Sequence, residues 1–269
     1  MPFLVSNISH MARVWLSSTK ASLVREMEFR GNFFAGLVRQ LIWVSIFILM
    51  VEVMFNNTQS LAGWDRSEVL LLLALSRIIE GLMGSLFIKN LMKLPQLVQE
   101  GKFDFHLVKP LPVQFYTAFR SASLDNLANI LAGLVLLIYA SAIAQINILS
   151  LAWLWLIIMS ISGMVIYYSL LIIAASLVFV LDRLEFLWGF NILISEPLTV
   201  PFDIFPRGAR FSLTYLLPLA FIVYVPAQAV TGRLSLFTAL VALFAAVIVL
   251  FLANLAWSAG LRRYSSASS

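Results

Sequence analysis

Long apolar runs are the feature that most constrains how this chain can fold. Of its 269 residues, 61% are hydrophobic and 12% are charged, whereas soluble domains carry about 25% charged residues. A helix needs about 20 apolar residues to cross the hydrocarbon core of a bilayer. Such runs lie near Phe33–Phe55, Ser67–Ile88, Ala122–Ile146, Leu151–Leu181, Phe186–Phe205 and Leu234–Leu261. They predict an all-α membrane protein with six transmembrane helices and no soluble catalytic domain.

The segment Pro201–Val230 is apolar enough to enter a bilayer but cannot form one straight helix. Each proline removes a backbone donor and kinks or ends a helix, and the segment contains Pro201, Pro206, Pro218 and Pro226. Hydrocarbon tolerates an interrupted backbone only where protein or a water-filled cavity surrounds it. We therefore expect a re-entrant helical segment over residues 206–232, between spans five and six. Such a segment suggests a protein that moves something across the membrane.

The positive charges favour six spans over seven. Cytoplasmic loops of membrane proteins carry an excess of lysine and arginine. With the N-terminus inside and six spans, the residues in the cytosol are Arg13, Lys20, Arg25, Arg30, Lys89, Lys93, Lys102, Lys109, Arg120, Arg183, Arg262 and Arg263. Only Arg66, Arg207, Arg210 and Arg233 then face outside, and a seventh span would also send Arg262 and Arg263 there. The net charge of +5 is thus explained by topology, and we expect no nucleic-acid partner.

Two segments are expected to lie outside the hydrocarbon on the cytoplasmic side. Residues 1–30 are basic, and a helical wheel places Met11, Val14 and Trp15 on one side, which predicts an amphipathic helix along the inner interface. Residues 31–269 then form the transmembrane domain. Its longest polar stretch is the loop 89–120, which contains three prolines and Gly101.

Part of this loop combines charges with apolar groups. In the run Glu100–Pro110, the residues Phe103, Phe105 and Leu107 alternate with polar ones. A solvated loop has no need of such exposed apolar groups. Either they turn back onto the membrane surface, or they insert into a cytoplasmic partner while the charges set the register.

No motif for catalysis, nucleotide or metal is legible in the chain. It has no cysteine, and its two histidines, His10 and His106, are far apart. The phosphate-binding pattern G-x-x-x-x-G-K-[ST] is absent, because Gly101-Lys102 is followed by Phe103. We expect no catalytic residue and no cofactor in this chain, so any energy from ATP must come from a partner.

Ionisable residues inside the predicted spans are costly and tend to face the protein interior. Arg77 and Glu80 are three residues apart and share a helix face, so they form either a self-neutralised pair or a polar lining or gate. Glu196 lies beside Pro197 in the fifth run, where it either reflects packing strain or lines a cavity.

Two regions resemble the permease subunit of bacterial type-2 ABC exporters. The first is GKFDFHLVKP, Gly101–Pro110, which is similar to the family loop G-x-(hydrophobic)-D-x-x-L-x-(K/R)-P. The second is the proline-rich run EFLWGFNILISEPLTVPFDIFP followed by LLPLAFIVYVPAQAVTG. One departure is Phe103, because family loops often have a small aliphatic residue there.

The resemblance implies a subunit without an ATPase site, which pairs with an identical or related second permease over two ATPase subunits. Those partners would bind ATP and Mg, and the complex would lie in the bacterial inner membrane with the termini of this chain in the cytoplasm. The residues implied in the coupling loop that docks on the ATPase are Glu100, Gly101, Phe103, Asp104, Lys109 and Pro110.

Other elements take roles from the same resemblance. Residues 1–30 would be a connecting helix, and Asp182, Arg183 and Glu185 a second cytoplasmic contact. The elements after the fifth span would close the outer side. The candidate pathway or gate residues are Arg77, Glu80, Glu196, Pro218 and Pro226.

A secondary transporter that uses Arg77, Glu80 and Glu196 for ion coupling is the main alternative. Such transporters have inverted repeats or broken helices in both halves, whereas interruption here is confined to the second half. A membrane scaffold would need neither the broken segment nor the apolar loop residues. The sequence leaves the substrate open among drug, peptide, lipid and glycan.

Overall fold

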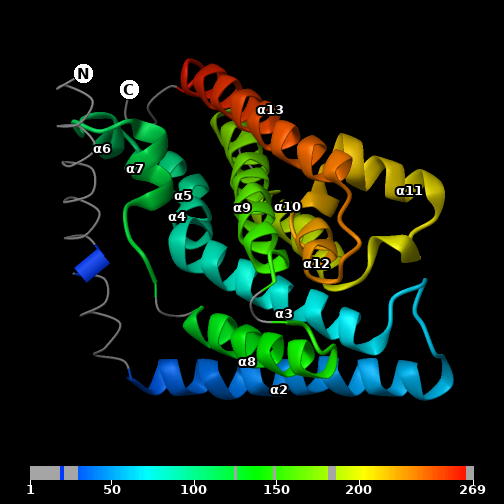
Figure 1. The fold of residues 1–269 in the computed structure, drawn as a ribbon. Coiled ribbons are helices and arrows are strands. Elements are labelled where there is room, and N and C mark those ends of the chain that lie inside the picture. The colour runs from blue at the N-terminus through cyan, green and yellow to red at the C-terminus, as the bar shows by residue number, and fades with distance from the viewer. Residues whose placement is uncertain (1–18, 21–29, 124–125, 148–149, 181–185, 265–269) are drawn as a thin grey trace.

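The computed structural model describes residues 19–20, 30–123, 126–147, 150–180 and 186–264. These residues form helices and turns without a β-strand, apart from one isolated bridge between Leu61 and Trp64 (Figure 1). The amphipathic helix predicted for residues 1–30 falls almost entirely outside the described residues. Thr19 and Lys20 are helical, and Arg30 begins α2.

Four helical stretches of the described chain are long and apolar enough to cross a membrane. They are Phe34–Asn57 in α2 (Arg30–Asn57), Arg66–Gln99, Ala152–Phe179 and Leu236–Leu261, the last being α13. Their positions confirm the predicted first, second, fourth and sixth runs. The third run forms α8 (Leu127–Ile143), an apolar helix of 17 residues. The chain is therefore an all-α, multi-pass membrane protein.

The fifth predicted run, Phe186–Phe205, is not one helix. Helix α10 (Phe186–Ser195) has ten residues, and the 3-10 turns η3 (Glu196–Thr199) and η4 (Phe202–Ile204) follow it. Val200 has an extended backbone, with φ −131° and ψ 152°, because the ring of the following proline disfavours helical geometry in the residue before it. The prolines therefore end this helix early.

The proline-rich segment is bent, as its composition predicts. Helix α11 (Arg207–Phe211) continues into the π turn η5 (Ser212–Leu216), and η6 (Leu219–Phe221) leads to α12 (Tyr224–Val230). The two halves, Arg207–Leu216 and Leu219–Val230, are bent by 72°, with Pro218 at the bend. Pro226 lies in the first turn of α12, where a missing backbone N–H breaks no intrahelical hydrogen bond.

Helix α3 (Arg66–Met83) packs against α8 through glycine. A Cβ atom added at Gly133 would lie 2.7 Å from Ile78 Cγ1 and 2.9 Å from the Ala74 carbonyl oxygen, and one added at Gly81 would lie 2.6 Å from Ile130 Cγ1. The two helices therefore touch almost backbone to backbone, as small residues allow in membrane helices. Helix α9 (Ala152–Ser176) packs on α13 beside this pair.

The helices place the two candidate regions at opposite ends of the molecule. Figure 1 shows α5 (Leu94–Gln99), α6 (Asp104–Leu107), α7 (Val113–Phe119) and the C-terminal end of α13 at one end, called here the loop end. Helices α11 and α12 and the α2–α3 turn lie at the other, the far end.

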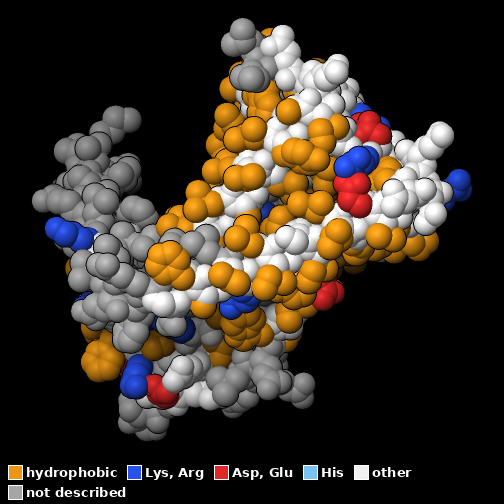
Figure 2. Space-filling model, turned by 90° about the horizontal axis from the view of Figure 1, so that it is seen from below, with side chains coloured by type: hydrophobic (Ala, Val, Ile, Leu, Met, Phe, Trp, Pro, Cys, Tyr) orange, Lys and Arg blue, Asp and Glu red, His pale blue; other side chains and the backbone are white. Residues whose placement is uncertain are grey.

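One helical run connects these ends. Arg66–Gln99 spans 34 residues and includes the π segment η1 (Gly84–Ile88) and the short α4 (Lys89–Leu91). At 1.5 Å per residue it is about 50 Å long, whereas the hydrocarbon core is about 30 Å thick. The run is therefore longer along its path than one span requires. Figure 2 shows a molecular face covered largely by hydrophobic side chains, as contact with lipid requires.

We predict that Gly133→Ala lowers the stability of the fold by about 1–3 kcal/mol, because the new methyl group must push α8 away from α3. The measurement is the thermal unfolding temperature in mild detergent. Gly189→Ala is the matched control, because nothing lies within 4 Å of a Cβ at Gly189 on α10 and alanine favours the helix by about 1 kcal/mol. Equal unfolding temperatures for the two variants would contradict the close packing of α3 and α8.

Candidate functional site

The loop 89–120 is a folded unit tied together by the amide of Asn90. This side chain is buried, and its nitrogen donates to the carbonyl oxygens of Ala118 at 2.9 Å and Ser121 at 2.8 Å. Its oxygen accepts a hydrogen bond from Ser121 Oγ at 2.9 Å. The start and the end of the loop are thus joined. Sequence reasoning missed Asn90, because its partners lie about 30 residues away.

Gly101 ends α5 and turns the chain into α6. Its φ of +68° lies in the left-handed region, which glycine adopts without the steric cost that other residues have. The Gly101 N–H donates to the Val98 carbonyl at 3.1 Å, and the Phe103 N–H donates to the Leu97 carbonyl at 2.9 Å. The glycine of the loop motif therefore sets the direction of α6.

Phe103 is fully buried, so the expectation that its side chain is exposed is wrong. Its ring centroid lies 5.1 Å from that of Phe179 and 5.2 Å from that of Tyr264. These partners belong to η2 (Leu177–Phe179), which continues α9, and to the residues after α13. The Tyr264 hydroxyl also donates to Asp104 Oδ1 at 2.9 Å. Phe103 and Asp104 therefore anchor the loop to two long helices.

Three apolar side chains stay exposed at the end of this anchored loop. Phe105 is 68% exposed, Leu107 39% and Val108 76%, and we call this set the docking tip. Lys109 and Pro110 beside it are exposed as well, and Glu100 pairs with Lys102 at 2.6 Å. Val108 is a member that sequence reasoning missed.

His106 lies next to the docking tip in the chain and is a buried, neutral residue. Its Nδ1 lies 3.1 Å from Thr117 Oγ1, and its ring centroid is 5.0 Å from that of Tyr116. Burial, followed by the positive charges of Arg120 and Lys109, lowers the pKa of the imidazole from 6.5 to about 4. At neutral pH the loop therefore packs around an uncharged histidine.

A second feature is a cavity of about 470 Å³ among α3, η1, the start of α8, α9 and α10, called here the polar cleft. Its lining includes Asn129 and Trp188, and also Asn191, whose Oδ1 accepts a hydrogen bond from the Tyr167 hydroxyl at 3.1 Å. Amides and a phenol inside a bundle of apolar helices can hydrogen-bond a polar group at membrane depth.

The predicted pair of Arg77 and Glu80 is present, with 3.1 Å between Arg77 Nη2 and Glu80 Oε2 and little exposure of either side chain. Glu80 also lines the polar cleft, whereas the Arg77 guanidinium lies 5.6 Å from the centroid of the Phe47 ring on α2. The pair is therefore internally neutralised, and its carboxylate is placed at the cleft.

The other candidate pathway residues are not gathered with this pair. Glu196 is exposed at the start of η3 and does not line the polar cleft, although the preceding Ser195 does. Pro218 and Pro226 are buried in the bent segment at the far end (Figure 1). The proposed second contact, Asp182, Arg183 and Glu185, lies outside the described residues.

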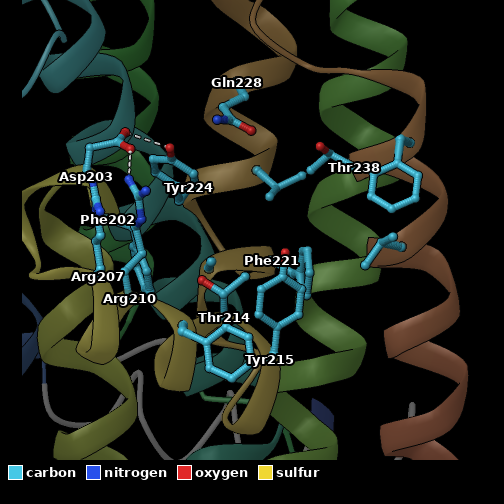
Figure 3. Close-up of a pocket in the computed structure, with 15 residues that line it drawn as sticks. Phe202, Asp203, Arg207, Arg210, Thr214, Tyr215, Phe221, Tyr224, Gln228 and Thr238 are labelled. Carbon is cyan, nitrogen blue, oxygen red and sulfur yellow. Dashed lines mark hydrogen bonds and ion pairs between the residues drawn. The ribbon is translucent and has the colours of Figure 1, made fainter.

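The far end is held by a hydrogen-bond network around Asp203. Its Oδ2 accepts hydrogen bonds from Trp64 Nε1 at 2.8 Å and from the Tyr224 hydroxyl at 2.6 Å, and its Oδ1 pairs with Arg210 at 2.6 Å. Figure 3 shows Arg210 and Tyr224 directed at this carboxylate. One carboxylate thus joins Trp64, which precedes α3, to both halves of the bent segment.

Arg233 adds a second connection next to this network. Its Nε donates to Glu68 Oε1 at 2.9 Å, and its guanidinium lies 5.0 Å from the ring centroid of the buried Trp64. Glu68 in turn belongs to the capping box of α3 with Asp65. Sequence reasoning missed Asp203, although it is the only acidic residue of Pro201–Val230 and has arginines four and seven positions later.

We predict that lowering the pH from 6.5 to 4 removes a stabilising contribution that depends on His106. Because the folded pKa is lower than the unfolded one, the unfolded chain binds more protons in this window. The contribution is complete above pH 6.5 and amounts to roughly 2–3 kcal/mol, lost as the pH falls to 4. Unfolding temperatures across this range should fall more steeply for the wild type and for His10→Asn than for His106→Asn. Parallel curves for all three would contradict the burial of a neutral His106.

We predict that Asp203→Asn loosens the far end, because the carboxylate that pairs with Arg210 loses its charge and a charge-assisted hydrogen bond contributes about 1.5–3 kcal/mol. Hydrogen exchange of peptides covering residues 203–230 should become faster. Glu52→Gln is the control, because it removes the exposed ion pair of Glu52 with Arg66, and exposed pairs contribute about 0–1 kcal/mol. Unchanged exchange in Asp203→Asn would show that the network does not hold this segment.

A comparison with protein families finds one match that covers most of the chain. The family described as ABC-2 family transporter protein matches residues 41–268, which include most of α2 and every described helix after it. No curated protein and no solved structure matches the chain. Together with the apolar helices, the match shows that this chain belongs to the ABC-2 transporter family and is its membrane-embedded permease.

Proposed function

We propose that this protein is the transmembrane subunit of an ATP-driven exporter and couples ATP hydrolysis by a separate ATPase subunit to export. The observation that carries this proposal is the docking tip. Three apolar side chains are exposed on a loop that is itself anchored to the transmembrane helices. Exposed apolar groups on a rigid support are typical of a protein–protein contact.

The contacts of the loop suggest how movement would be transmitted. The docking tip is continuous with the helical run Arg66–Gln99, and Phe103 packs on residues that follow α9 and α13. A displacement of the tip therefore acts on three spans at once. ATP binding would close the ATPase subunits, and the packed helices would respond by shifting as rigid elements between two arrangements.

The proposed complex contains two ATPase subunits, which bind ATP and Mg, and a second permease that is identical or related. Helix α2 supports such a pairing, because only 12% of its apolar window is buried and it is free to contact lipid or another chain. Residues 182–185 would make a second contact with the ATPase. We place the complex in the bacterial inner membrane, with the loop end and both termini in the cytoplasm, in keeping with the positive-inside rule.

In this arrangement the bent segment Arg207–Val230 is re-entrant and closes the outer side between the fifth and sixth spans. The fifth span would consist of α10 and the turns that follow it. The network of Asp203 and Arg233 holds the closed arrangement, and the polar cleft with Glu80 provides hydrogen bonds for a polar cargo group on the cytoplasmic half of the pathway.

We predict that Phe105→Asp releases the ATPase subunit from the tagged permease. The substitution removes the apolar ring from the contact and puts there a carboxylate that must lose its hydration shell. The affinity should therefore fall at least tenfold. The measurement is affinity purification from mild detergent, with the co-eluting ATPase quantified by mass spectrometry. Gln59→Asp, on the exposed α2–α3 turn at the far end, is the control and should retain it.

Two results would contradict the proposed function. One is full retention of the ATPase by Phe105→Asp, which would place the docking contact elsewhere. The other is wild-type protein that elutes alone, which would favour a transporter that does not use ATP.

A further inference from the structure

A cavity of about 450 Å³ lies at the far end, between the bent segment and the first turns of α13 (Figure 3). Its volume is in the range of small-molecule sites, about 300–1,000 Å³. Thr214, Gln228 and Thr238 bring two hydroxyls and an amide to its lining from three separate segments. Neither the docking of an ATPase nor the polar cleft involves this cavity.

The side chains that line this cavity carry a net charge of +1 at neutral pH. Its ionisable side chains with a charge at neutral pH are Asp203, Arg207 and Arg210. Asp203 pairs with Arg210, and its other oxygen already accepts hydrogen bonds from Trp64 and Tyr224. Arg207 has neither an ion pair nor a side-chain hydrogen bond among the described residues. Its guanidinium therefore remains available to an anion.

The cavity lies where α13 enters the membrane. Helix α13 begins at Leu236 and crosses the bilayer, and Phe237, Thr238 and Val241 from its first turns line the cavity. Three aromatic side chains of the lining are strongly exposed, Phe237 at 75%, Phe211 at 65% and Tyr215 at 62%. Aromatic side chains are enriched at the membrane–water interface. The cavity thus combines an exposed cationic side chain and hydrogen-bonding groups with an aromatic rim at headgroup depth.

We propose that this cavity binds the anionic headgroup of a membrane amphiphile, a phosphate-bearing lipid or lipid-like molecule. The Arg207 guanidinium holds the phosphate through charge-assisted hydrogen bonds, and the hydroxyls of Thr214 and Thr238 and the amide of Gln228 bind other polar groups of the headgroup. The hydrocarbon chains lie against Phe211 and Phe237. A soluble anion would leave this aromatic rim without a role.

The first test measures which lipid the purified protein retains. Nanodiscs with equal amounts of phosphatidylglycerol and phosphatidylcholine are the probe, and native mass spectrometry counts the bound lipids. We expect phosphatidylglycerol to be enriched on the wild type and on Arg207→Lys, and about five- to tenfold less on Arg207→Gln. Arg66→Gln is the control, because it removes the same charge at the far end from a residue outside the cavity.

The second test separates an amphiphile from a free anion. The chain has no cysteine, so Thr214→Cys provides a single thiol within the cavity. Phosphatidylglycerol should slow its alkylation, whereas inorganic phosphate at millimolar concentration should not.

Three results would overturn the proposal: no preference for phosphatidylglycerol, equal losses in Arg207→Gln and Arg66→Gln, or protection of the thiol by phosphate alone. None of these measurements needs the ATPase or transport, so failure here is separate from failure of the proposed function.

Discussion

The burial of Phe103 is the contact on which the rest of the functional architecture depends. Its ring joins a loop of the second span to residues that follow α9 and α13. Burying a phenylalanine side chain contributes about 1.5–3 kcal/mol, and aromatic pairs add roughly 0.5–1.5 kcal/mol. Without this anchor, the docking tip would lie on a flexible loop that could not transmit a movement to the helices. With it, Phe105, Leu107 and Val108 are held in a defined position relative to α9 and α13.

Both ends of the molecule combine aromatic packing with hydrogen bonds. At the loop end Phe103 packs on Phe179 and Tyr264, and Asn90 joins the two ends of the loop by hydrogen bonds. At the far end Trp64 packs on Tyr224, and Asp203 and Arg233 make hydrogen bonds and ion pairs. Hydrogen bonds are directional and are lost steeply when their geometry changes. In the proposed exporter, the far end would therefore switch between a closed and an open arrangement rather than deform gradually.

Much of the fold could be predicted from the sequence, because hydrocarbon imposes simple rules on length and composition. Six apolar runs were predicted to span the membrane, and four of them form long helices. The prolines predicted the interruption of the segment near Pro218. Phe103 was assigned to the surface because Phe103, Phe105 and Leu107 alternate along the chain. Alternate residues share a face in an extended strand, but α6 is helical, so Phe103 and Phe105 point in different directions. Asp203 could not be assigned, because its partner Trp64 is 139 residues away in the chain.

Site-specific crosslinking from the docking tip is the measurement that tests the coupling role of this protein most directly. A single cysteine in place of Val108, in a chain that has no other, would be coupled to a short photoactivated crosslinker in native membranes. Its adducts would be compared with those from a cysteine in place of Gln59. We expect Val108 to give a covalent adduct with an ATPase subunit and Gln59 to give none. Adducts of Val108 with lipid alone would show that the tip lies on the membrane surface and would contradict a docking role.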